Sequence, residues 1–222
     1  MNKVAVLVDG GFFKKRMLEI YGQMGPEELA LEMLRQCHAH VRRHSTKRNR
    51  RELYRIFYYD CPPLAKKMTH PLTGATVDYS QKPSAQDALK FLKILRETRK
   101  VALRLGKLSV YGSDYTLPPY NVKKLCKGII NSDNLKPRHF KPAIRQKGVD
   151  MRIGLDIASL AYKHQVDQIV LIAGDSDFVP AAKLARREGI DFILDPMWNY
   201  ISKDLMEHID GLYSTCAKPK DE

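Results

Sequence analysis

Residues 168–178 read QIVLIAGDSDF, a short apolar run that ends in a pair of aspartates. Residues 4–11 read VAVLVDGG, a second apolar run that also ends in an aspartate. Runs this short, this apolar and this rich in β-branched residues are typical of strands buried on both faces, as in a parallel sheet. Ligands of open α/β sheets bind outside the carboxyl ends of the strands, so Asp9 and Asp175 should lie side by side if these strands are neighbours.

Strands alternate with helices along the rest of the chain. Three further strands are predicted at residues 52–60, 107–112 and 190–194. Helices are predicted at residues 29–43, 85–105, 150–164, 178–188 and 201–209. The stretches 64–83 and 113–147 are predicted to be loops, and a loop as long as the second is usually functional or mobile. This alternation predicts an α/β fold with a mostly parallel central sheet and helices on both of its faces.

Composition limits the class of protein. The chain has 222 residues, which fits a single domain. Its four cysteines form no CxxC pair, so neither a zinc ribbon nor a disulfide framework is indicated. No apolar stretch reaches the roughly 18 residues of a membrane span, and the first apolar run is too short for a secretory signal. We therefore expect a cytoplasmic protein with no membrane partner.

The net charge indicates the kind of partner. Lys and Arg total 38 against 25 acidic residues, which gives a formal charge of +13. An excess of this size attracts polyanions over long distances, and nucleic acid is the leading candidate. A basic surface without a specialised partner is the alternative on charge alone.

Four aspartates are the candidate catalytic and metal-binding residues: Asp9, Asp150, Asp175 and Asp177. Close carboxylates repel one another, and a hard cation such as Mg²⁺ relieves the repulsion by taking their oxygens as ligands. Asp150 and Asp177 each begin a predicted helix, so helix capping is the alternative role for both. At about 100° per residue, Asp150 faces the side of its helix that turns toward the sheet.

Two other aspartates are interpreted as structural. Asp156 lies six residues after Asp150, about 9 Å along the helix axis, which is too far for both to bind one ion readily. Asp60 ends a predicted strand, as Asp9 does, but Cys-Pro-Pro follows it. A turn residue is therefore favoured over a role at the rim of the site.

The motifs VDGG at 8–11, KGVD at 147–150 and AGDSDFVPAAKLARREG at 173–189 together resemble the NYN domain. This family is the LabA-like branch of the PIN-like nuclease superfamily. The resemblance implies a three-layer α/β/α sandwich, PIN-like and Rossmann-like, with a central parallel sheet. It also implies an acidic cluster that binds Mg²⁺ or Mn²⁺ and cleaves RNA. Carried over residue by residue, those acids are Asp9, Asp150, Asp175 and Asp177.

The resemblance extends over residues 3–215, so we expect one domain at 1–215 and a flexible tail at 216–222. Residues 61–147 match nothing specific and are expected to be a divergent loop and helical elaboration. One position departs from the family pattern, because Phe12 stands where many members have an asparagine three residues after the first aspartate. The polar contact of that asparagine is therefore absent.

Two basic segments are candidate nucleic-acid-binding surfaces. Residues 42–51 (RRHSTKRNRR) hold six Lys or Arg, and residues 136–147 (KPRHFKPAIRQK) hold five and lead directly to Asp150. Such segments bind phosphates electrostatically, although the first could equally be a solvated loop. The candidate contact residues are Arg48, Arg50, Arg138, Lys141, Arg145 and Lys147. Tyrosines at strand ends and in loops could stack unpaired bases, which favours a single-stranded substrate.

These observations predict a metal-dependent ribonuclease that hydrolyses phosphodiester bonds of single-stranded RNA. The alternative is a catalytically inactive RNA-binding or adaptor protein that retains the PIN-like fold, and Phe12 motivates it. A phosphohydrolase acting on small nucleotides is a third hypothesis. The sequence lacks both a DxD after the first strand and a GxxxxGK[ST] phosphate loop, which speaks against this third class. The choice of RNA over DNA, the number of ions and a homo-oligomeric state stay open.

Overall fold

The computed structural model describes residues 2–43, 45–46 and 50–219. Its centre is a six-stranded sheet in the order β10-β9-β8-β1-β2-β5, and every neighbouring pair in it is parallel. The strands are β1 (Asn2–Asp9), β2 (Arg51–Asp60), β5 (Val101–Leu105), β8 (Gln168–Ile172), β9 (Asp191–Asp195) and β10 (Gly211–Leu212). The α/β class and the parallel sheet predicted from the sequence are thus confirmed.

The strand order reverses between β1 and β8. From β1 the chain proceeds outward through β2 to β5, and its last third builds the other half of the sheet from β8 to β10. Val8 lies level with Ile172 in this pair. The two apolar runs are therefore neighbours, and the aspartates that follow them lie at the topological switch point, where ligands of α/β proteins bind.

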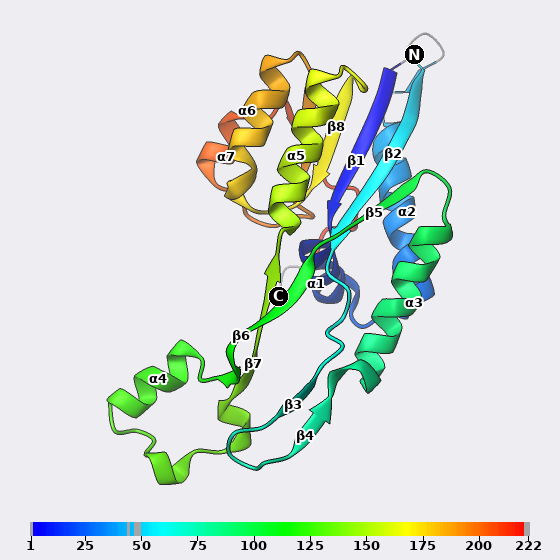
Figure 1. The fold of residues 1–222 in the computed structure, drawn as a ribbon. Coiled ribbons are helices and arrows are strands. Elements are labelled where there is room, and N and C mark those ends of the chain that lie inside the picture. Colours follow the sequence, from blue (N-terminus) through cyan, green and yellow to red (C-terminus); the bar gives the residue numbers. More distant parts are fainter. Residues whose placement is uncertain (1, 44, 47–49, 220–222) are drawn as a thin grey trace.

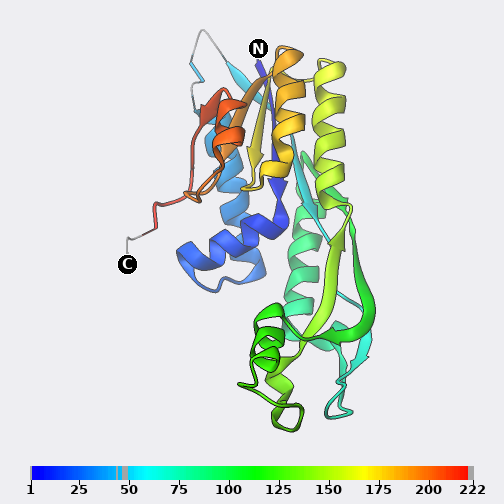
Figure 2. The ribbon, with the colours of Figure 1, turned by 90° about the vertical axis from the view of Figure 1, so that its left-hand side faces the viewer.

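Helices cover both faces of the sheet (Figures 1 and 2). One face carries α1 (Gly10–Tyr21), α2 (Pro26–Arg42) and α3 (Pro83–Glu97), and the other carries α5 (Val149–Tyr162), α6 (Val179–Arg187) and α7 (Lys203–Glu207). Along β1, Val4, Val6 and Val8 pack into the core under α1 to α3, while Ala5 and Leu7 pack into the opposite core. Burial on both faces explains why this strand is apolar throughout.

In the layered core, α1 and β5 differ most from the sequence prediction. The first is α1, which covers a stretch where no element is predicted: the Asp9 side chain caps it, and Phe13 and Met17 are buried one turn apart. The second is β5, which lies inside the predicted helix 85–105. The chain leaves the helix at Thr98 and turns at Lys100, whose φ is 64°. The next five residues then pair with β2, and the backbone hydrogen bonds of that pairing outweigh the amphipathic pattern.

The predicted strand 107–112 and much of the two predicted loops form a second structural unit that projects from the carboxyl edge of the sheet (Figure 1). It consists of β3 (Lys67–Thr69), β4 (Thr76–Asp78), η1 (Tyr79–Gln81), β6 (Lys107–Thr116), α4 (Pro119–Cys126), η2 (Ser132–Asn134), η3 (Pro137–His139) and β7 (Lys141–Lys147). We call this unit the extension. The antiparallel hairpin β3–β4 packs against the antiparallel ribbon β6–β7. The contact is made by the ring of His70, which follows β3, with Tyr115 in β6 and with Phe140 just before β7.

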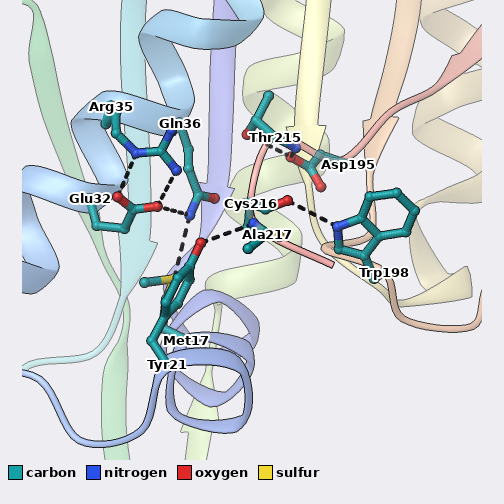
Figure 3. A network of polar contacts seen from close by, with 10 residues as sticks. All are labelled: Met17, Tyr21, Glu32, Arg35, Gln36, Asp195, Trp198, Thr215, Cys216 and Ala217. Carbon is teal, nitrogen blue, oxygen red and sulfur yellow. Dashed lines mark hydrogen bonds and ion pairs between the residues drawn. The ribbon is translucent and has the colours of Figure 1, made fainter. Parts of the chain in front are cut away.

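The C-terminal segment packs against α1 and the loop after β9 (Figure 3). Cys216 is buried, and its carbonyl accepts a hydrogen bond from the Trp198 indole at 3.0 Å. The backbone N–H of Ala217 donates to the Tyr21 hydroxyl, also at 3.0 Å. Contacts therefore continue into the first residues of the predicted tail, whose last three residues, 220–222, lie outside the described part. No helix among the described residues is long and apolar enough to cross a membrane.

Candidate active site

Asp9 is a partly buried acid at the carboxyl edge of the sheet. It is the last residue of β1, and its Oδ1 accepts hydrogen bonds from the backbone N–H groups of Gly11 at 3.0 Å and Phe12 at 3.1 Å. The pKa of Asp9 is raised from its usual 3.8 to about 6, mainly by burial and also by the nearby carboxylates of Asp150 and Asp60, despite these two bonds. Within the described residues, Asp9 Oδ2 accepts no hydrogen bond, so it is available as a ligand.

The charge of Asp150, an exposed residue, acts on Asp9, and the charges of the two aspartates that follow β8 act on Asp150. It is the second residue of α5. Burial raises its pKa, and the charges of Asp175 and Asp177 raise it further. The structure therefore brings the four predicted acids into one electrostatic group, with Asp150 as the shared neighbour. Their oxygens are not tightly clustered, since no three of them lie within 4.8 Å of one another in the described part of the chain.

The acids differ in whether they cap a helix, the alternative role considered for them. Asp175 Oδ1 accepts a hydrogen bond from the Asp177 backbone N–H at 3.1 Å, and so caps the short helix η4 (Ser176–Phe178). Asp177 and Asp150 accept no capping bond among the described residues, and the residue before α5 is Gly148. Capping thus accounts for one oxygen each of Asp9 and Asp175, whereas Asp150 and Asp177 lie in the first turns of α5 and η4 without such a bond among the described residues.

Asp60 belongs to this site, although its sequence context favoured a turn. Its side chain is 3% exposed at the end of β2, the strand next to β1. Its oxygens accept hydrogen bonds from the Tyr58 hydroxyl, the Cys61 backbone N–H and the Gln146 amide, and Lys14 Nζ lies 2.6 Å away. The signal that could have identified it was its strand-end position, which is the same signal that identified Asp9.

Asp156 has the contacts of a structural residue. Its Oδ2 accepts a hydrogen bond from the Tyr59 hydroxyl at 2.8 Å and from Arg104 Nε at 2.8 Å. These bonds join α5 to β2 and β5 across one face of the sheet. The contacts agree with the interpretation of Asp156 made from the sequence.

Phe12 fills the space between the two loops that carry Asp9 and Asp175. A Cβ atom placed on Gly174 would lie 2.5 Å from the Phe12 ring, so only glycine allows this close approach. The backbone N–H of Phe12 also donates to Asp9. Phe12 therefore supports Asp9 through its backbone, while its side chain offers the site no polar atom.

The basic residues predicted to bind nucleic acid fall into two places. Lys141, Arg145 and Lys147 are exposed on β7, and Arg138 is exposed in η3, so these four lie on the extension. Arg50 lies at the opposite edge of the sheet, where its carbonyl accepts a hydrogen bond from the Asn2 backbone N–H. Arg48 lies outside the described residues.

Gln146 is a site residue that the sequence did not indicate. Its side chain donates to Asp60 and lies close to Gly11, the residue two positions after Asp9. Neighbouring residues of a strand point to opposite faces, so Arg145 and Lys147 lie on the face of β7 away from Gln146. The ribbon thus presents an amide to the acidic group on one side and cations on the other.

Comparison with known proteins identifies the family. The NYN domain family matches residues 74–214, which is more than half of the chain and includes Asp150, Asp175 and Asp177. The chain therefore belongs to the NYN domain family. This family is part of the PIN-like nuclease superfamily, whose nucleases generally use divalent metal ions.

Two individual relatives share sequence or structure with this chain. An uncharacterized protein of Methanocaldococcus jannaschii is 27% identical over 103 residues, which cover 46% of this chain and 37% of the relative. The chain thus spans well under half of the length of that relative. The crystal structure of a protein of unknown function from Vibrio parahaemolyticus aligns with 97% of this chain and 93% of its own, with 16% identity and a TM-score of 0.49.

Proposed function

We propose that this chain is a ribonuclease that hydrolyses phosphodiester bonds of single-stranded RNA with Mg²⁺ or Mn²⁺ as its cofactor. The observation that carries the proposal is the enclosed carboxylate of Asp9. It is held at the switch point of the sheet, beside Asp150 and Asp60, with its pKa raised to about 6. Crowding of carboxylates does not benefit a carboxylate with a purely structural role. A group of acids with shifted pKa values is typical of functional sites.

The donor set fits a hard divalent cation. All candidate ligands are carboxylate oxygens, which Mg²⁺ and Mn²⁺ prefer, and Asp9 Oδ2 and Asp150 accept no hydrogen bond among the described residues. Asp9, Asp150 and Asp175 would hold the ion, with Asp177 beside them. When bound, such an ion activates a water molecule and polarises the scissile phosphate. Asp60 holds Lys14 within 2.6 Å, next to the same group, where the ammonium can contact a phosphate.

Capture of the substrate is assigned to the extension. Lys141, Arg145 and Lys147 lie along the face of β7 away from Gln146, with Arg138 in η3, and β7 ends three residues before Asp150. Cations of this kind hold the phosphates of any sequence, and their contribution falls as salt rises. Arg50 lies at the other edge of the sheet and is not part of the extension. We place the reaction in the cytoplasm, as the sequence predicts.

The test is cleavage of a labelled single-stranded RNA by the purified chain with Mn²⁺ and, separately, with EDTA. Asp9→Asn and Asp175→Asn should each abolish Mn²⁺-dependent cleavage while the circular dichroism spectrum stays unchanged. Asp167→Asn is the matched control, because Asp167 accepts a hydrogen bond from the Lys3 backbone N–H at the opposite edge of the sheet. Cleavage by Asp9→Asn at the wild-type rate would refute the assignment.

A second candidate function is an RNA-binding protein without catalysis. The observation that favours it is the Phe12 ring, which fills the space against Gly174 where a polar side chain would face the site. In that case the chain binds RNA with a steep salt dependence, and neither Mg²⁺ nor Mn²⁺ supports cleavage. The same assay therefore separates the two functions.

A further inference from the structure

A cavity of about 410 Å³ opens next to Asp60, between α1, α2 and α3. Its floor is apolar and buried, and consists of Met17, Phe91 and Leu92. The Leu18 side chain, 59% exposed, lies at the rim. Ligand pockets in proteins have volumes of about 300–1,000 Å³ and combine apolar walls with a few polar groups. This cavity has the volume and the walls of such a pocket.

The polar groups of the cavity lie in two places. Lys14 and Asp60 are on the side that faces the acidic group, and they are paired at 2.6 Å. Asp60 is saturated, since Tyr58, Cys61 and Gln146 also donate to it. It therefore holds the ammonium of Lys14 at the wall of the cavity. Asp87 and Ser84, both in the first turns of α3, supply an exposed carboxylate and a hydroxyl at another part of the lining.

We propose that this cavity binds one nucleobase of the RNA strand, from a nucleotide next to the one whose phosphate lies at Asp9. The inference rests on the proposed function, because it uses the same substrate and the same edge of the sheet. Asp60 links the two places, since it lines the cavity and its charge also acts on Asp9. A base has an apolar face and a polar edge, which match the apolar floor and the polar groups of the cavity.

The carboxylate of Asp87 gives the cavity a preference among bases. A carboxylate accepts hydrogen bonds, so it favours bases that carry an exocyclic amino group. Guanine, adenine and cytosine carry one, whereas uracil offers only its N3–H, which lies between two carbonyl oxygens that repel a carboxylate. The cavity should therefore bind uridine most weakly, and replacing the carboxylate should remove the difference.

The experiment measures binding rather than cleavage, so it does not depend on catalysis. The full chain is titrated in EDTA against fluorescein-labelled single-stranded RNAs, each with one abasic nucleotide at a different position. For the wild type, one position should lower the affinity about tenfold when its base is removed. Ala88→Trp fills the cavity from α3 and should bind the intact RNA about as weakly as the wild type binds that abasic RNA. In this variant the abasic substitution should then have less than about a twofold effect.

Leu89→Trp is the matched control, because Leu89 is the next residue of α3, is 47% exposed and is not part of the cavity lining. It should keep the wild-type pattern. Asp87→Ala is a second variant on an exposed helix position, and it should remove the discrimination against uridine at the sensitive position. Circular dichroism confirms that each variant is folded.

The outcomes separate this inference from the proposed function. The inference is wrong if no single position is sensitive in the wild type, or if Ala88→Trp keeps the full abasic effect. In either case, the ribonuclease assignment still holds if the wild type binds RNA and cleaves it with Mn²⁺. If the wild type binds no RNA, both fail together.

Discussion

Asp9→Asn should stabilise the metal-free protein at neutral pH, although it destroys the proposed activity. The side-chain oxygen of Asn can still accept the hydrogen bonds from Gly11 and Phe12, so the cap of α1 is retained. What the substitution removes is a negative charge that burial and two neighbouring carboxylates disfavour. The free energy of unfolding should therefore increase wherever Asp9 is ionised in the wild type.

The magnitude follows from the pKa of Asp9, which is about 6 in the folded chain against a usual 3.8. Below pH 3.8 the carboxyl group is protonated in both states, and the wild type and the variant should have similar stabilities. Between pH 3.8 and 6 the unfolded chain releases the proton and the folded chain keeps it, so the wild type loses stability as pH rises. Each pH unit in this window costs about 1.4 kcal/mol, so the loss reaches about 3 kcal/mol and is constant above pH 6.

The assay is urea unfolding of both proteins in EDTA at pH 4 and pH 8. We expect a small difference at pH 4 and a gain of about 3 kcal/mol for Asp9→Asn at pH 8. Adding Mn²⁺ at pH 8 should raise the stability of the wild type, by about 2.7 kcal/mol at one hundred times the dissociation constant, and leave the variant unchanged. A variant that is less stable than the wild type at pH 8 would refute the reasoning, as would a gain that does not depend on pH.

Three further predictions concern packing and RNA binding. Gly174→Ala places a Cβ atom 2.5 Å from the Phe12 ring and should destabilise the chain by about 1–3 kcal/mol in urea unfolding. Gly154→Ala, in α5 with nothing within 4 Å of the added Cβ, should instead stabilise it by about 0.5–1 kcal/mol, and equal effects at both sites would contradict the role given to Phe12. Lys147→Ala should weaken RNA binding and reduce the slope of log affinity against log salt by about one. Arg50→Ala should change the affinity and the slope less than Lys147→Ala does. If Arg50→Ala has the larger effect, the RNA binds at the other edge of the sheet.

The sequence predicts the parts of the fold in which local pattern and tertiary environment agree. Val4, Val6 and Val8 face one core, and Ala5 and Leu7 face the other. A strand in that position must be apolar at every residue, and this makes it visible in the sequence. The strand β8, which pairs with β1, is visible in the sequence for the same reason. The aspartates that end both apolar runs, Asp9 and Asp175, are therefore recognisable as candidates for one site from the pattern of residues alone.

The parts that could not be predicted depend on contacts between distant segments. Residues 101–105 continue the amphipathic pattern of α3, and they form a strand only because they pair with the edge of β2. Asp60 looks like a turn residue because Cys-Pro-Pro follows it, and its role becomes visible only when β2 is seen next to β1. Gln146 has no local signal at all, since it reaches the acidic group through the pairing of β6 with β7.

The arrangement of charge explains how an acidic site can serve an anionic substrate. The four aspartates and Asp60 repel phosphate, while the chain as a whole carries a charge of +13. The two signs are separated along the chain but joined at one point, because β7 ends at Lys147 and α5 carries Asp150 three residues later. Under the proposed function, phosphates held on the extension would lie next to carboxylates that would otherwise repel them. A divalent cation at that junction would reduce the local negative charge, so binding of the strand and binding of the ion should strengthen each other.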